Sequence, residues 1–152
     1  IPEEERHDII GSYYKRLTSE DRKIREEAAR EWSIWEGSVM TLYPVPNVEE
    51  SAGEINFALS VATIECHFWM NDMFWGGDDN WLLNNVSTIK DIPTYIVHGR
   101  YDVDCRPINA YELSKKLNNC DLDFVISGHS SAEPAIVDAL VRATDRFKEI
   151  LK

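Results

Sequence analysis

Two residues that could do chemistry together follow two short apolar runs in the second half of the sequence. Asp102 comes just after the strand-forming run 95–97 and Gly99, and His129 comes just after a second apolar run at 122–126. Parallel sheets present their functional side chains at the carboxyl ends of their strands. An acid that orients a histidine acting as general base is two thirds of a nucleophilic triad. The plainer interpretation is that Asp102 caps a loop and His129 is an ordinary turn residue.

The stretch between Asp102 and His129 has room for one loop, one helix and one strand. Pro107 suits the first turn of that helix. Such a parallel crossover would place the two strand ends side by side. Asp104 is a rival for the acid and His98 a rival for the base, although His98 precedes the acid on the same strand and is poorly placed to meet it.

Two glutamates in the first half occupy positions where a helix should be apolar. Glu36 lies four residues after Trp32, and Glu65 lies four residues before Trp69. A carboxylate among aromatic side chains is costly unless it is paired. A structural ion pair or a partly exposed edge position would explain either residue alone. Two such residues in one helical half favour a site for a cationic ligand group, lined by aromatic side chains.

The cysteines provide one further site candidate, and their spacing does not suggest a framework of disulfides. Cys105 shares a predicted loop with Asp102, so a nucleophilic Cys–His pair is conceivable, but we favour a small apolar pocket residue. The cysteines at 66, 105 and 120 lack CxxC spacing and fit reduced thiols of a cytoplasmic protein better than disulfides. The sequence supports neither a metal nor an organic cofactor.

The elements that must position these residues divide the sequence in two. Apolar residues at helical spacing predict an all-helical part over 1–75, ending at the loop signal Trp75–Asn80. Over 76–152, the predicted strands alternate with helices, the last of which begins at Pro134 and places Leu151 on its apolar face.

Composition excludes several classes of protein. The 152 residues are 43% hydrophobic, enough for a packed core, and the net charge of −11 argues against binding nucleic acid or an anionic membrane surface. No apolar run approaches the roughly 18 residues of a membrane span. The start I-P-E-E-E-R-H lacks Met and is no signal peptide, which suggests processing, trimming or a piece of a longer chain.

Several stretches, in this order, carry a resemblance that covers nearly the whole chain: E-W-S-I-W-E-G at 31–37, I-E-C-H-F-W at 64–69, I-P-T-Y-I-V-H-G-R-Y-D at 92–102, S-G-H-S-S-A-E-P at 127–134 and V-D-A-L-V-R-A-T at 137–144. They resemble the proline iminopeptidase (prolyl aminopeptidase) family of α/β-hydrolases. One departure is Arg106, which separates Cys105 from Pro107 where the family usually reads Cys-Pro.

The resemblance implies an α/β fold in which 1–75 is part of a helical cap and 76–152 is the C-terminal part of the α/β-hydrolase core, with its parallel sheet. It implies a serine-type hydrolase, an aminopeptidase that releases N-terminal proline from peptides.

The resemblance also assigns roles to the candidate residues. Asp102 and His129 look like the triad acid and base, and Cys105 looks like the cysteine that lines the proline pocket. Glu36 and Glu65 look like the cap carboxylates that hold the free α-amino (imino) group of the substrate.

The nucleophile of such an enzyme is missing from this sequence. No G-x-S-x-G occurs, and the serines at 127, 130 and 131 lack the context of a nucleophile elbow. We therefore expect a C-terminal half that is inactive alone and packs against an N-terminal half that carries the serine. The alternatives are another capped α/β-hydrolase, acting on an ester, epoxide or halide, and a non-catalytic interaction module derived from a hydrolase.

Overall fold

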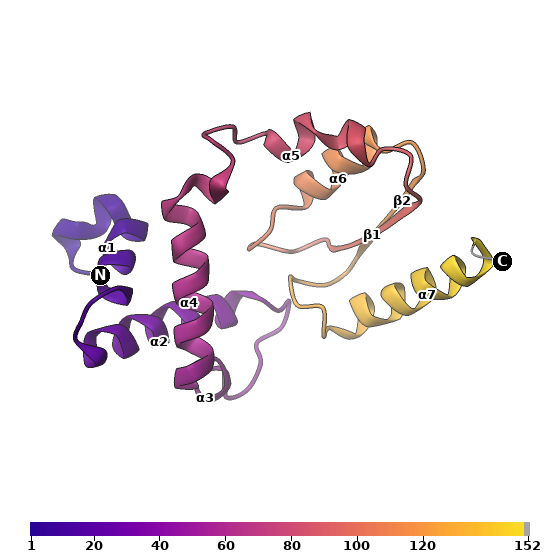
Figure 1. Ribbon diagram of the computed structural model, residues 1–152. Helices are drawn as coiled ribbons and strands as arrows, with labels where there is room; N and C mark the ends of the chain where they lie inside the picture. The colour runs from indigo at the N-terminus through magenta and orange to yellow at the C-terminus, as the bar shows by residue number, and fades with distance from the viewer. Residues whose placement is uncertain (151–152) are drawn as a thin grey trace. The chain divides into compact units, whose positions relative to one another are not determined.

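The computed structural model describes residues 1–150, which form two compact units (Figure 1). The first unit comprises Ile1–Ser38 and Val45–Asp79. The second comprises Val39–Pro44 and the chain from Asn80 onward. Leu151, which the sequence places on the apolar face of the last helix, lies outside the described residues. The assignment of 1–75 to a cap and 76–152 to a hydrolase core remains a prediction.

The first unit is helical, and small side chains pack its helices together. Its elements are the 3-10 helix η1 (Glu3–Asp8), α1 (Ile9–Leu17), α2 (Arg22–Val39), α3 (Val48–Ala52), α4 (Ile55–Met70) and the 3-10 helix η2 (Asp72–Phe74). Their buried cluster consists of Leu17, Ala28, Ala29, Ala58, Ala62 and Cys66. The four alanines come from α2 and α4, α1 contributes Leu17, and larger partly buried side chains pack against this cluster: Ile10, Tyr13, Tyr14, Trp32 and Leu59.

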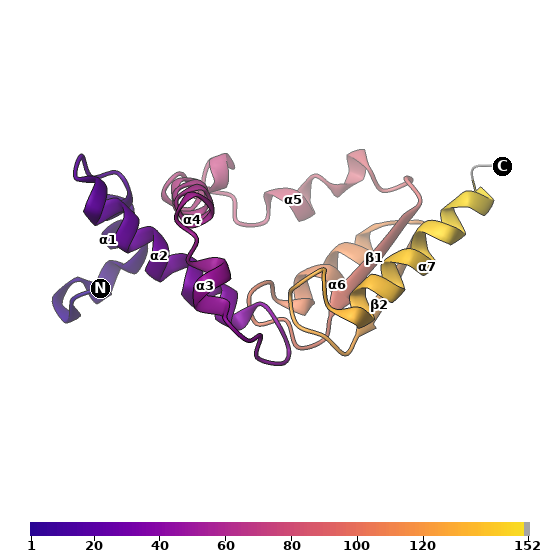
Figure 2. The same ribbon diagram turned by 90° about the horizontal axis from the view of Figure 1, so that it is seen from below.

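The second unit contains a two-stranded parallel sheet. Its elements are α5 (Trp81–Asn84), the 3-10 helix η3 (Val86–Thr88), β1 (Thr94–Gly99), α6 (Pro107–Lys116), β2 (Cys120–Val125) and α7 (Pro134–Ile150). Thr94 pairs with Cys120 and Gly99 pairs with Val125, so the two strands end at the same level. The predicted parallel crossover is therefore confirmed, and α6 and α7 lie on either side of the strands (Figures 1 and 2).

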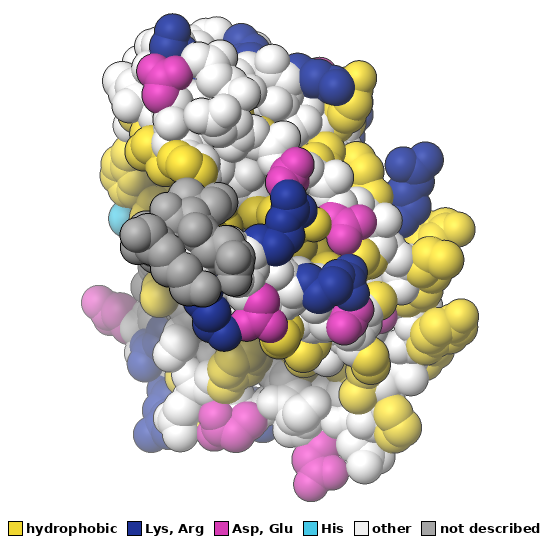
Figure 3. Space-filling model, turned by 90° about the vertical axis from the view of Figure 1, so that its right-hand side faces the viewer, with side chains coloured by type: hydrophobic (Ala, Val, Ile, Leu, Met, Phe, Trp, Pro, Cys, Tyr) yellow, Lys and Arg dark blue, Asp and Glu magenta, His cyan; other side chains and the backbone are white. Residues whose placement is uncertain are grey.

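The helix α7 covers the sheet with only part of its apolar surface. Ile136 and Ala139 are buried, whereas Val137, Leu140 and Val141 are exposed. The view in Figure 3 shows exposed hydrophobic side chains among charged ones on this side of the molecule.

Candidate active site

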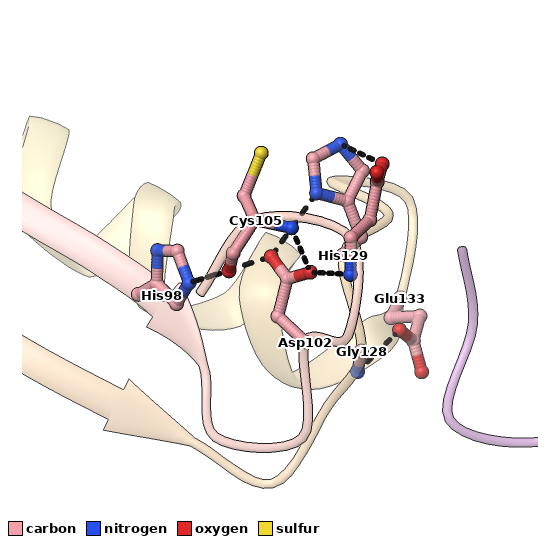
Figure 4. Close-up of polar contacts among 7 residues, drawn as sticks. His98, Asp102, Cys105, Gly128, His129 and Glu133 are labelled. Carbon is pink, nitrogen blue, oxygen red and sulfur yellow. Dashed lines mark hydrogen bonds and ion pairs between the residues drawn. The ribbon is translucent and has the colours of Figure 1, made fainter. Parts of the chain in front are cut away.

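Asp102 lies at the centre of a polar cluster just beyond the carboxyl end of β1 (Figure 4). Its side chain is 3% exposed, and its Oδ1 accepts hydrogen bonds from the N–H groups of Asp104 at 3.0 Å and Cys105 at 2.8 Å. Its Oδ2 lies 3.0 Å from His129 Nδ1 and 3.3 Å from His98 Nε2. These partners offset the cost of removing a carboxylate from water.

The hydrogen bond to Asp102 fixes the orientation and the tautomer of His129. A carboxylate only accepts hydrogen bonds, so the 3.0 Å contact assigns the ring proton to Nδ1 and leaves Nε2 as the basic nitrogen. The side chain is 30% exposed, and Nε2 lies 3.6 Å from Asp104 Oδ2. Asp102 and Asp104, the two rival acids, thus face opposite nitrogens of one ring.

His98 reaches Asp102, although we expected it to be poorly placed because it precedes the acid on the same strand. The chain turns back after Gly99, with the N–H of Asp102 donating to the Gly99 carbonyl at 3.3 Å. However, His98 is 17% exposed, its Nε2 also lies 3.0 Å from the Cys105 carbonyl, and its ring packs on Phe124. Its Nε2 is therefore occupied within the loop, whereas that of His129 faces a more open side.

Two glycines let the loop of Asp102 and the loop of His129 approach one another. A Cβ at Gly99 would lie 1.8 Å from the carbonyl oxygen of Gly128, so no side chain fits there. A Cβ at Gly128 would lie 2.8 Å from the backbone nitrogen of Leu42 and 2.9 Å from the carbonyl oxygen of Met40. The segment Val39–Pro44 thus lies directly against the His129 loop.

Asp104, Cys105 and His129 form a group that could hold a metal ion, with a ligand atom from each within 4.8 Å of the others. Asp104 and Cys105 are exposed on their loop. A metal on His129 Nε2 would block the nitrogen that the pairing with Asp102 leaves basic.

The two glutamates of the first unit are half-buried, and the surroundings of Glu65 differ from the predicted ones. Glu65 accepts a hydrogen bond from Trp32 Nε1 at 2.8 Å, which joins α4 to α2. Trp69, expected on the same buried stripe, is 57% exposed. Glu36 is half-buried on α2. A tryptophan N–H therefore supplies the partner that the aromatic surroundings of Glu65 require.

Ser127, Cys66 and Cys120 are poorly suited to act as nucleophiles. Ser127 is fully buried, and its Oγ has no hydrogen-bond partner among the described residues. Burial raises the pKa of the Cys66 thiol to about 11, and it also raises the pKa of Cys120. Cys105 is exposed on the acid loop.

Sequence reasoning missed Glu133 and the segment Val39–Pro44. The Glu133 carboxylate accepts the N–H groups of Gly128 at 2.7 Å and Leu42 at 3.2 Å. The Met40 carbonyl accepts the N–H groups of His129 and Ser130. The glutamate beside G-H-S was visible in the sequence, but its distant partner was not.

Comparisons with known proteins identify relatives across nearly the whole chain, although no family model matches it. A probable proline iminopeptidase of Leptolyngbya boryana is 47% identical over 148 residues, which is 97% of this chain and 46% of that protein. The proline iminopeptidase of Arabidopsis thaliana is 41% identical over 155 residues, 99% of this chain and 40% of that protein. That of Neisseria gonorrhoeae is 36% identical over 146 residues, 95% of this chain and 45% of that protein.

The chain spans about half the length of the curated relatives it matches or somewhat less. Its helical first unit and its two parallel strands flanked by helices agree with the C-terminal part of an α/β-hydrolase. Within residues 1–150, no helix combines the length and apolar character that crossing a membrane requires. Over nearly its whole length, the chain is homologous to the C-terminal half of proline iminopeptidases.

Proposed function

We propose that this chain is the C-terminal half of a serine-type aminopeptidase that releases N-terminal proline from peptides. The observation that carries the proposal is the 3.0 Å contact between His129 Nδ1 and the buried Asp102 carboxylate, in a chain 47% identical to a probable proline iminopeptidase. The pair lies beyond the ends of β1 and β2, the edge where a parallel sheet keeps its chemistry.

In the proposed mechanism, His129 moves protons and Asp102 holds it in place. As the hydroxyl oxygen of a serine in the N-terminal half attacks the substrate carbonyl carbon, Nε2 takes the hydroxyl proton. The same nitrogen then protonates the leaving amine, the peptide C–N bond breaks, and a prolyl ester remains on the serine. Water hydrolyses this ester by the reverse set of proton transfers. Asp102 stabilises the imidazolium at each stage.

Glu36 and Glu65 are proposed to bind the positively charged imino group of the substrate's N-terminal proline. Paired acids in an aromatic surrounding stabilise a cation that water would otherwise solvate. An internal peptide bond carries no such cation, so this interaction explains why the enzyme would act only at chain termini. Cys105 is proposed to contribute to the small apolar surface against which the proline ring packs.

The nucleophile and the oxyanion donors are proposed to lie in an N-terminal half, because this sequence has no G-x-S-x-G. Widely spaced cysteines support a cytoplasmic location for the complete enzyme.

Reconstitution tests the proposed function. The 152-residue chain, mixed under refolding conditions with a separately produced N-terminal half, should hydrolyse proline p-nitroanilide, and the mixture should react with a fluorophosphonate. The chain alone should do neither. A serine-containing full-length protein that fails to react with the fluorophosphonate would refute the triad, and would favour a non-catalytic interaction module.

Glutamate variants distinguish the aminopeptidase from another capped hydrolase. Glu36→Gln and Glu65→Gln should lower kcat/KM on proline p-nitroanilide far more than on a neutral p-nitrophenyl ester, because only the first substrate carries the cation. Glu27→Gln, an exposed position on α2, is the matched control. Equal losses on both substrates would instead support an enzyme for esters, epoxides or halides.

A further inference from the structure

The loop that carries His129 has no regular structure, so a few hydrogen bonds define its position. Three consecutive backbone N–H groups, those of residues 128–130, all point to fixed acceptors. Gly128 donates to Glu133 Oε1 at 2.7 Å, while His129 and Ser130 donate to the Met40 carbonyl at 2.7 and 2.8 Å. Ser127 and Gly128 are also buried, whereas the preceding Ile126 is 72% exposed, so close backbone packing and these hydrogen bonds together hold the loop.

The Glu133 carboxylate accepts N–H groups both from the His129 loop and from the segment Val39–Pro44. Its Oε1 accepts the N–H of Gly128 (Figure 4). Its Oε2 accepts the N–H of Leu42 at 3.2 Å, and Leu42 lies two residues beyond Met40. One carboxylate thus joins the peptide next to His129 to the segment that holds His129 from the other side. Only a carboxylate offers two acceptor oxygens and no donor to this pair of N–H groups.

The position of Glu133 makes this use of its side chain unusual. Its backbone carbonyl accepts the N–H groups of Ile136 and Val137, so it stands at the start of α7. A polar side chain there normally caps its own helix. The Glu133 carboxylate instead binds the N–H groups of Gly128 and Leu42 and does not cap α7. Such a departure from the local preference is typical of residues with a functional role.

We propose that Glu133 is a positioning residue that holds His129 in register with Asp102 by bridging Gly128 and the segment Val39–Pro44. This inference rests on the proposed function for its effect on catalysis.

The test compares Glu133→Gln, Glu133→Asp and the control Glu112→Gln, at an exposed position on α6, in the chain joined to its N-terminal half. Glutamine keeps one acceptor and opposes the other N–H with its own amide donor, and aspartate is one methylene too short for both bonds. Both changes should lower kcat on proline p-nitroanilide on the order of 10- to 100-fold, with KM within twofold. The rate of fluorophosphonate labelling should fall by the same factor, whereas Glu112→Gln should match the wild type.

A purely structural role predicts a lower melting temperature with unchanged kcat at temperatures where the variant is folded. That result in Glu133→Gln would overturn the inference. If the wild-type assembly does not hydrolyse the anilide, the proposed function fails, and NMR then decides the inference separately. The His129 Nδ1 proton and the Gly128 amide should exchange with solvent at least tenfold faster in Glu133→Gln than in Glu112→Gln; equal rates would refute the bridge.

Discussion

Asp102 is a carboxylate whose burial is matched by hydrogen bonding. Oδ1 is used by two backbone N–H groups of its own loop, and Oδ2 is left to the two histidines. The loop bonds hold the carboxylate independently of His129, so the acid is already oriented before it meets the base. Such preorganisation lets a carboxylate fix a tautomer without moving during a reaction.

Asparagine at either rival acid position distinguishes their roles. In the reconstituted enzyme, Asp102→Asn should lower kcat on the order of 10³- to 10⁴-fold, because the amide no longer selects the Nδ1–H tautomer. Asp104→Asn should change kcat by less than tenfold, because Asp104 faces the other nitrogen from an exposed position. Steady-state kinetics with proline p-nitroanilide measure both; a larger loss in Asp104→Asn would reverse the assignment of the acid.

Ser127 offers a prediction about stability. Its buried Oγ has no partner among the described residues, and an unsatisfied buried hydroxyl costs free energy that alanine avoids. Ser127→Ala should therefore leave the free energy of unfolding unchanged or raise it by about 1 kcal/mol. Urea denaturation of the assembled protein measures this, with the half-buried Ser130→Ala as control. A clear loss of stability in Ser127→Ala would reveal a partner for the hydroxyl.

Pattern alone reached some residues of the site and missed others for physical reasons. Asp102 and His129 could be paired because strand ends in a parallel crossover share an edge, and that depends only on the order of elements. The approach of His98 depends on the turn after Gly99, whose course the strand pattern does not encode. The exposure of Trp69 depends on which helices cover α4, which its own spacing cannot specify.

At the scale of elements, α4 begins with a charged cap that makes the first unit sensitive to acid. The Glu54 carboxylate accepts the N–H groups of Asn56 and Phe57, at 3.2 and 2.8 Å. The Phe57 and Asn56 hydrogen bonds lower the pKa of Glu54 from its usual 4.5. Because the folded pKa lies below the unfolded one, the cap stabilises the folded chain above about pH 4.5.

This stabilisation should be lost as the pH falls through the lowered pKa of Glu54. Glu54→Gln keeps an acceptor but cannot ionise, so its melting temperature should fall less steeply below pH 4.5 than that of the wild type. Circular dichroism melts from pH 3 to 7, in roughly half-unit steps, measure the difference. Glu50→Gln, on the exposed side of α3, is the control. If the melting temperatures of Glu54→Gln and the wild type fall equally steeply below pH 4.5, the ionised cap does not contribute to the stability of the folded chain.

The elements themselves could be predicted better than the contacts between them. The strands begin and end within a few residues of their predicted positions, and Pro107 and Pro134 begin α6 and α7, because local residue preferences determine both features. The bridge from Glu133 to Leu42 spans 91 positions in the sequence, and no local preference reports such a contact. The residues that hold His129 were therefore the least accessible to sequence reasoning.

At the scale of the whole molecule, the sheet of the second unit is too small to cover the apolar side chains that this unit exposes. The described residues form two strands, and two-stranded sheets are at best marginally stable in water. Apolar side chains on α7 and the strongly exposed Ile126 and Val103 add surface that a stable monomer would bury. The relatives' additional length supplies, under the proposed function, the polypeptide that covers it.

The 152-residue chain alone should therefore bind an apolar-surface dye such as 8-anilinonaphthalene-1-sulfonate and self-associate as its concentration rises. Its exposed strand edges and apolar side chains favour contact with any surface that removes them from water. Adding the N-terminal half should reduce the dye fluorescence several-fold and give a one-to-one complex by size-exclusion chromatography with light scattering. An unrelated α/β protein of similar charge is the control and should change neither signal. Fluorescence unaffected by the N-terminal half would mean that the exposed surface belongs to this chain's own stable form, and that the two halves do not assemble through it.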